Sequence, residues 1–90
     1  MLKILEELIL LVRERKKNPK KDSYTNKILE NKTLAKDKVI EEINELIESV
    51  SNNSNKIHEA ADVFYHLILL LETHDIKMED VIAELKKRQK

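Results

Sequence analysis

The feature that most constrains this chain is the absence of glycine from all 90 of its residues. The phosphate cradles of Rossmann and P-loop proteins need glycine at fixed positions, so the sequence excludes both. It also has one proline and no cysteine, which excludes a disulfide framework, a zinc–thiolate site and a thiol nucleophile. With 41% hydrophobic and 38% charged residues, the composition is typical of a soluble, almost entirely helical protein.

Length and charge further limit the kinds of protein that this chain can be. We expect a single domain over residues 1–90, because chains usually divide at about 100–200 residues per domain. The 17 Lys and Arg residues balance 17 Asp and Glu residues, which argues against a nucleic-acid partner bound by bulk positive charge. The most apolar stretches, 2–12 and 60–71, are short of the roughly 20 residues of a membrane span. We therefore expect no membrane or nucleic-acid partner, and a cytoplasmic protein without a signal peptide.

Apolar periodicity and capping residues predict helices separated by short polar turns. Asn18-Pro19 ends the first helix, because proline lacks a donor and disfavours helix in the residue before it. Asp22-Ser23 offers an N-cap for a short helical piece, Thr33 offers one for the next helix, and the end of the polar loop 51–55 offers one for the fourth. The expected helices cover 2–17, 23–30, 34–50, 56–73 and 77–88. This pattern predicts an all-α fold, a helical bundle of four to five helices.

The fourth expected helix carries an anomaly. Its segment 60–71 is apolar nearly all round, yet Asp62 and His66 lie in it one turn apart, with Glu59 one turn earlier. A buried carboxylate without a partner is costly, so something must compensate for it. One explanation is a core pair in which Asp62 accepts a hydrogen bond from His66. For Glu59 and Asp62 together, a cation is the better compensation.

The third expected helix, 34–50, has acidic residues beside its apolar face. At 100° per residue, Lys38, Glu42 and Glu45 form a stripe along the edge of the apolar seam, and Glu41 points further out. The seam itself is expected to consist of Val39, Ile43, Leu46 and Val50.

Antiparallel packing of the third and fourth helices would bring two pairs of acids together. Glu42 and Glu45 would then face Glu59 and Asp62. Four converging carboxylates form an all-oxygen site of the kind that Mg²⁺ or Mn²⁺ prefers, and the ion would remove their mutual repulsion. The alternative is that these acids only form a solvated helix face.

Four segments of the chain together resemble a known family. They are Asp22-Ser23-Tyr24-Thr25, 38–45 (KVIEEINE), 59–67 (EAADVFYHL) and 80–88. ExxE followed by ExxD is the metal motif of the all-α NTP pyrophosphohydrolase (MazG-like) superfamily. The chain also has the Ser-Tyr-Thr and Tyr-His segments. Over about residues 1–88 it therefore resembles one member of this superfamily, the phosphoribosyl-ATP pyrophosphohydrolase family of histidine biosynthesis.

The resemblance implies a MazG-like fold and a hydrolase. The expected reaction is Mg²⁺-dependent cleavage of phosphoribosyl-ATP between its α and β phosphates, which gives phosphoribosyl-AMP and pyrophosphate. Glu42, Glu45, Glu59 and Asp62 are expected to bind Mg²⁺, with Mn²⁺ as the other candidate ion. Glu41 or one of these ligands would orient or deprotonate the attacking water.

Four further residues are candidates for contact with the substrate. Lys38 and Arg88 would contact phosphate oxygens, since a point charge and a guanidinium fork both bind them. Tyr24 and Thr25 would touch the substrate, or would serve only as a cap and a packing contact. Glu41, Glu42 and Lys38 are therefore the expected catalytic residues.

Two other functions fit the same residues. A related pyrophosphohydrolase acting on dUTP or damaged dNTPs would share the four carboxylates and differ in its base pocket. A non-catalytic helical interaction module would carry the acids only as a charged surface.

The chain is also expected to form a homodimer or a dimer of dimers. The fourth helix is apolar all round, and the first has a wide apolar stripe that includes Leu5, Leu8, Ile9 and Val12. Five short helices cannot cover both within one chain, and two-fold pairing is the commonest way to bury such surface. The superfamily resemblance also implies dimers, with sites near the subunit interface.

Overall fold

The computed structural model describes residues 2–89, in which every regular element is an α-helix. The helices are α1 (Lys3–Lys17), α2 (Tyr24–Leu29), α3 (Lys32–Asn52), α4 (Lys56–Thr73) and α5 (Met78–Arg88). The predicted all-α fold class is confirmed, while the two end residues of the expected domain, 1 and 90, lie outside the described part. Over 2–89, no helix combines the length and the apolar character needed to cross a membrane.

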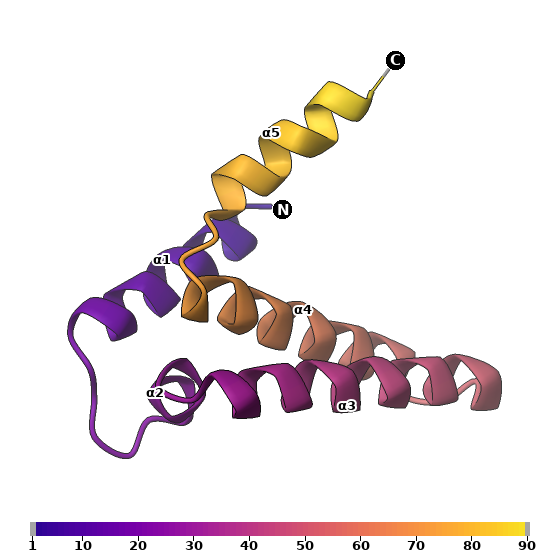
Figure 1. Ribbon diagram of the computed structural model, residues 1–90. Coiled ribbons are helices and arrows are strands. Elements are labelled where there is room, and N and C mark those ends of the chain that lie inside the picture. The colour runs from indigo at the N-terminus through magenta and orange to yellow at the C-terminus, as the bar shows by residue number, and fades with distance from the viewer. Residues whose placement is uncertain (1, 90) are drawn as a thin grey trace.

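An antiparallel pair of helices, α3 and α4, dominates the molecule (Figure 1). α1 and α2 pack against the end of this pair that holds the start of α3 and the end of α4. α5 extends away from the pair. The apolar core lies where α1, α2, α3 and α4 meet, and its buried residues are Ile9, Val12, Ile28, Ala35, Ile68 and Leu69. The other half of the α3–α4 pair, toward the turn that joins them, is therefore free to carry polar groups.

Side-chain caps explain where two helices begin, and a third predicted cap is absent. Ser23 caps α2 by accepting from Asn26 N at 3.3 Å, as predicted. The predicted cap at Thr33 is wrong, because Asn31 lies in the extended region and accepts from Leu34 N at 3.0 Å, so α3 begins earlier. The predicted cap of α4 is also wrong: Asn55 has φ 51°, outside the extended geometry that a capping side chain needs.

The left-handed turns of this chain are made without glycine. Asp22, Asn53, Asn55 and Asp75 have φ between 51° and 66°. Asp and Asn tolerate this region better than other side chains, because they hydrogen-bond locally. Asp and Asn therefore occupy the left-handed turn positions that glycine occupies in other proteins.

The buried face of α3 differs from the predicted seam. Val39 is buried as expected, but Ile43 and Val50 are exposed, and the buried face includes Glu42 and Ser49. α4 packs on the face of α3 that carries Glu42 and Glu45. The most apolar stripe of α3 lies outside this face. That stripe, which we call the α3 apolar stripe, remains exposed and consists of Ile40, Ile43, Ile47 and Val50.

Candidate active site

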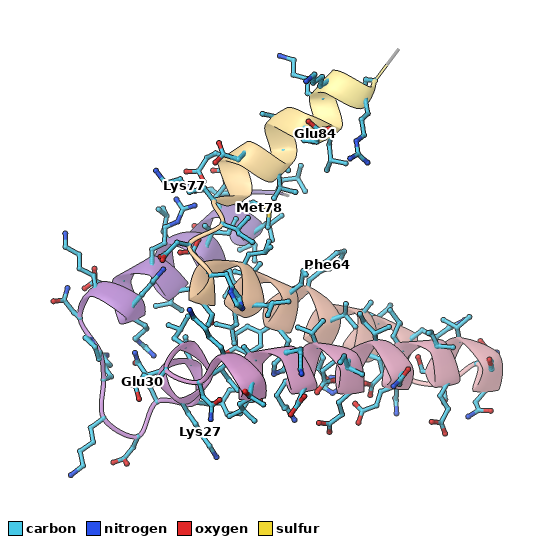
Figure 2. All side chains as sticks on the ribbon, viewed as in Figure 1. Lys27, Glu30, Phe64, Lys77, Met78 and Glu84 are labelled. Atoms are coloured by element: carbon cyan, nitrogen blue, oxygen red, sulfur yellow. The ribbon has the colours of Figure 1, made fainter. Side chains whose placement is uncertain are left out.

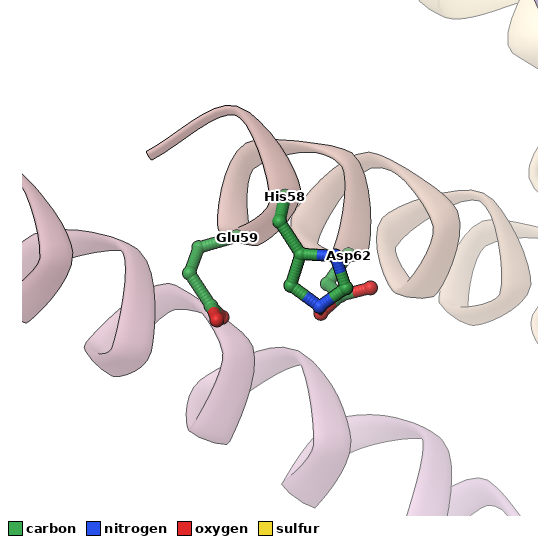
Figure 3. A group of neighbouring side chains, drawn as sticks. All are labelled: His58, Glu59 and Asp62. Atoms are coloured by element: carbon green, nitrogen blue, oxygen red, sulfur yellow. The ribbon is translucent and has the colours of Figure 1, made fainter. Parts of the chain in front are cut away.

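Carboxylates from α3 and α4 meet between the two helices. Donor atoms of Glu42, Glu45 and Glu59 lie within 4.8 Å of one another. A second group with the same spacing joins Glu59 to Asp62 and His58. Figure 3 shows the side chains of this second group pointing from α4 toward α3. The four carboxylates anticipated from the sequence thus form two overlapping groups that share Glu59.

Two oxygens in this cluster are buried without a hydrogen-bond partner, Glu42 Oε2 and Glu59 Oε2. Burial, followed by the neighbouring carboxyls of Glu45 and Asp62, holds the pKa of Glu42 well above the usual range of a carboxyl. Partial burial, and then the charge of Glu45, also raises the pKa of Glu59. The charged form of each carboxyl is therefore disfavoured, and a bound cation would remove this cost.

His58 belongs to this cluster, and the sequence reasoning missed it. Its exposed ring places Nε2 at 3.3 Å from Asp62 Oδ2 (Figure 3). The four-residue spacing of His58 and Asp62 on one helix could have indicated this contact.

The alternative core pair between the carboxylate of Asp62 and His66 is wrong. His66 Nδ1 lies 2.9 Å from the main-chain oxygen of Asp62, one turn earlier on the helix. The ring therefore contacts the helix backbone, while the carboxylate of Asp62 lies near His58.

Lys38 and Glu41 lie at the edge of the cluster. Lys38 Nζ is 3.1 Å from Glu41 Oε2 and 4.0 Å from Glu42 Oε1. The hydrogen bond to Glu41 raises the pKa of Lys38, so the ammonium form is stabilised. Glu41 is more exposed than Glu42, as its position on the helix predicted. A cation and an accessible carboxylate thus flank the buried acids.

The start of α2 is held against α4 by two side-chain hydrogen bonds. Tyr24 Oη lies 2.8 Å from His66 Nε2, and Thr25 Oγ1 lies 2.6 Å from Tyr65 Oη. The Tyr24 ring also stacks against that of Tyr65. Burial raises the pKa of Tyr24, and the positive charge of Lys38 partly opposes this rise.

Arg88 is not brought to the cluster. It lies in the last turn of α5, which extends away from α3 and α4 (Figure 1), and its Nε is 3.3 Å from Glu84 Oε1.

Comparison with known proteins identifies the family. The family model described as phosphoribosyl-ATP pyrophosphohydrolase matches residues 5–89. The chain belongs to the phosphoribosyl-ATP pyrophosphohydrolase family. It is 42% identical to the phosphoribosyl-ATP pyrophosphatase of Bacillus mycoides, over 94% of this chain and 82% of the relative. It is 41% identical to that of Sulfurisphaera tokodaii (97% and 96%) and 38% identical to that of Methanocella arvoryzae (100% of both). No solved structure matches the chain.

Three of the four segments that resemble the phosphoribosyl-ATP pyrophosphohydrolase family lie together in the fold. Segments 38–45 and 59–67 provide the two sides of the carboxylate cluster, and 22–25 is bonded to the second of them. The fourth segment, 80–88, stays apart on α5.

Proposed function

We propose that this chain is a Mg²⁺-dependent phosphoribosyl-ATP pyrophosphohydrolase. It would hydrolyse phosphoribosyl-ATP between its α and β phosphates, giving phosphoribosyl-AMP and pyrophosphate, the second step of histidine biosynthesis. The observation that carries the proposal is the pair of buried, unpartnered oxygens on Glu42 and Glu59, in a chain whose relatives are named for this activity.

The donor set fits a hard divalent cation. Glu42, Glu45, Glu59 and Asp62 would hold it, because carboxylate oxygens suit Mg²⁺ and the unpartnered oxygens need a positive charge nearby. When bound, the ion neutralises phosphate charge and lowers the pKa of a coordinated water. His58 adds a nitrogen donor beside Asp62, which makes Mn²⁺ the second ion to test.

The surrounding side chains suit the remaining tasks. Glu41 is accessible at the edge of the cluster, so its carboxylate would accept a hydrogen bond from the attacking water and orient it. One of the ligand carboxylates is the alternative for this role. Lys38 would exchange its contact with Glu41 for a phosphate oxygen of the substrate. Tyr24 and Thr25, held at the start of α2, would contact the rest of the nucleotide.

The active form would be a homodimer, or a dimer of two such dimers. The exposed α3 apolar stripe and Phe64 on α4, which is 63% exposed, form apolar surface that one chain leaves uncovered. Figure 2 shows Phe64 pointing away from α3. A second copy would cover this surface, and Arg88 would then serve the partner's site rather than its own.

The direct test is release of pyrophosphate from phosphoribosyl-ATP, measured with and without Mg²⁺. We expect Mg²⁺-dependent release that is faster with phosphoribosyl-ATP than with dUTP or other dNTPs. Faster release from a dNTP would instead favour a nucleotide house-cleaning enzyme. Calorimetric titration with Mg²⁺ separates either enzyme from a non-catalytic module, since a merely charged surface binds no stoichiometric ion.

A further inference from the structure

Both ring nitrogens of His66 make hydrogen bonds. This side chain is buried, with 6% of the residue exposed, between α4 and the start of α2. Nδ1 lies 2.9 Å from the carbonyl oxygen of Asp62, and Nε2 lies 2.8 Å from the phenol oxygen of Tyr24. The ring thus links a turn of α4 that carries a candidate metal ligand to a residue that borders the site.

The first of these contacts fixes the tautomer of the ring. A carbonyl oxygen can only accept a hydrogen bond, so Nδ1 of His66 carries the proton and donates to Asp62. In the neutral ring, Nε2 is then the unprotonated nitrogen and can only accept. Tyr24 must therefore donate its single phenolic proton to His66.

This polarity determines what Tyr24 can do at the site. Its proton is committed to His66, so the phenol oxygen has only lone pairs left to offer another group. The residue is 45% exposed. A ligand can therefore reach it. Burial raises the pKa of this phenol, and the charges of Lys38, Glu42 and Glu41 also act on it.

The position of the phenol is also fixed. The neighbouring bond from Thr25 to Tyr65 joins the same two segments, and the Tyr24 and Tyr65 rings stack with centroids 6.4 Å apart. His66 meets both tyrosine rings edge-on. Two hydrogen bonds between adjacent residue pairs hold the backbone at the start of α2, so Tyr24 cannot swing away without breaking this packing.

We infer that His66 is a positioning residue that makes Tyr24 a hydrogen-bond acceptor for the substrate. Tyr24 then recognises a donor group, either a ribose hydroxyl or an N–H of the base, and not a phosphate oxygen, which needs a donor. This inference rests on the proposed function for the identity of the ligand. The direction of the Tyr24–His66 hydrogen bond is independent of the proposed function.

The bond direction is tested without substrate by ¹⁵N NMR of the histidine rings in the intact protein at a pH where the rings are neutral. We expect His66 to show a protonated Nδ1 and an unprotonated Nε2, and Tyr24→Phe to shift the Nε2 resonance most. A protonated Nε2 with an unprotonated Nδ1 would overturn the inference. Because this experiment needs no activity, its result is independent of the proposed reaction.

The role of the bond is tested by kinetics with phosphoribosyl-ATP. Tyr24→Phe and His66→Phe should each raise KM about 3- to 10-fold, the range of one hydrogen bond, with a smaller change in kcat. The double variant should be no worse than either single variant. His66→Gln, whose side-chain oxygen can accept from the phenol, should recover part of the loss.

A matched control separates positioning from stability. His74→Phe changes an exposed histidine just beyond the end of α4 and should leave KM unchanged. If Tyr24→Phe and His66→Phe lower only the melting temperature, or if their effects on KM add, His66 has a structural role and the inference fails. If phosphoribosyl-ATP is not hydrolysed at all while the NMR result holds, the proposed function fails and the bond direction stands.

Discussion

Glu42 is the residue at which the stability of the fold and its chemistry conflict most directly. Its side chain is 9% exposed, and its Oε2 atom has no hydrogen-bond partner. The nearest cation, Lys38, is 4.0 Å away and also serves Glu41. A buried carboxylate in this setting destabilises the fold, and the proposed cation would offset that cost.

Replacement of this carboxylate tests both effects at once. Glu42→Gln removes one charge from the cluster, so it should stabilise the metal-free protein by about 1 kcal/mol, which raises Tm by about 4–8 °C in a domain of this size. The same variant should lose Mg²⁺ binding and Mg²⁺-dependent turnover, and Asp62→Asn should lose turnover with its helical circular dichroism intact. Near-normal activity in either variant would contradict the metal assignment.

Lys38 provides the second prediction at this scale. Lys38→Ala should weaken substrate binding or transition-state stabilisation by about 1–3 kcal/mol, because a charge-assisted hydrogen bond to phosphate is lost. Lys36→Ala is the control, since Lys36 lies on the same helix and faces only the exposed Asp37 at 4.0 Å. Unchanged steady-state kinetics in Lys38→Ala would show that Lys38 only pairs with Glu41 and does not contact the substrate.

α5 is attached to the rest of the molecule by Met78, which packs partly buried against the core, and by side-chain charges. None of its residues is buried. Arg13 on α1 provides the link, because its Nη1 donates to Glu79 Oε2 at 2.8 Å and its Nε to Glu72 Oε2 at 3.2 Å. Glu72 is buried near the end of α4. One guanidinium thus ties α1, α4 and α5 together.

This attachment should weaken in acid. The hydrogen bond with Arg13 lowers the pKa of Glu79 from 4.5 to about 2. A carboxyl with a lowered pKa stabilises the fold above its ordinary pKa, and its contribution is lost as the pH falls through the lowered value. The free energy of unfolding should therefore be higher in the wild type than in Glu79→Gln at pH 6, and this difference should shrink by pH 2.

Denaturant titrations at both pH values measure that difference. Glu84→Gln is the control, because Glu84 pairs with Arg88 inside the same helix and joins no second element. An unchanged advantage of the wild type over Glu79→Gln at pH 2 would show that the ion pair with Arg13 is not its source.

For the whole molecule, the most prominent feature is apolar surface that residues 2–89 leave uncovered. The α3 apolar stripe runs along one side of the α3–α4 pair, and α4 adds Ile57 and Phe64. Near the termini, Leu2, Ile4, Ile82 and Leu85 are also exposed. Soluble monomers seldom expose so many large apolar side chains on adjoining elements.

Self-association is therefore the expected solution state. Light scattering should give a mass of at least twice 10.6 kDa at micromolar concentration, and Tm should rise with protein concentration. Ile47→Glu should shift the protein toward the monomer, because it places a charge in the α3 apolar stripe. Asn44→Glu adds the same charge to α3 outside the stripe and should have a smaller effect. A mass of 10.6 kDa with a concentration-independent Tm would contradict the dimer.

Local preferences determined much of this protein from sequence alone. A chain without glycine that alternates amphipathic runs with polar turns forms helices, since each turn of helix is decided by residues three and four apart. The same periodicity placed Glu42 with Glu45 on one face and Glu59 with Asp62 on another, so the carboxylate cluster followed once α3 and α4 packed together. The end of α1 before Pro19 and the cap at Ser23 were local in the same sense.

The choice of buried face and of long-range partners depends on which helix surfaces pack together, and only the tertiary structure shows that choice. Hydrophobicity favoured Ile43 and Val50 as core residues, but α4 packs on the face of the paired glutamates and leaves both exposed. His66 could have bonded the carboxylate of Asp62, yet its ring bonds the main-chain oxygen of Asp62 and the phenol of Tyr24, 42 residues away, because α2 is packed against α4. A helix fixes which residues share a face, while the choice of the buried face depends on every other element that competes for contact.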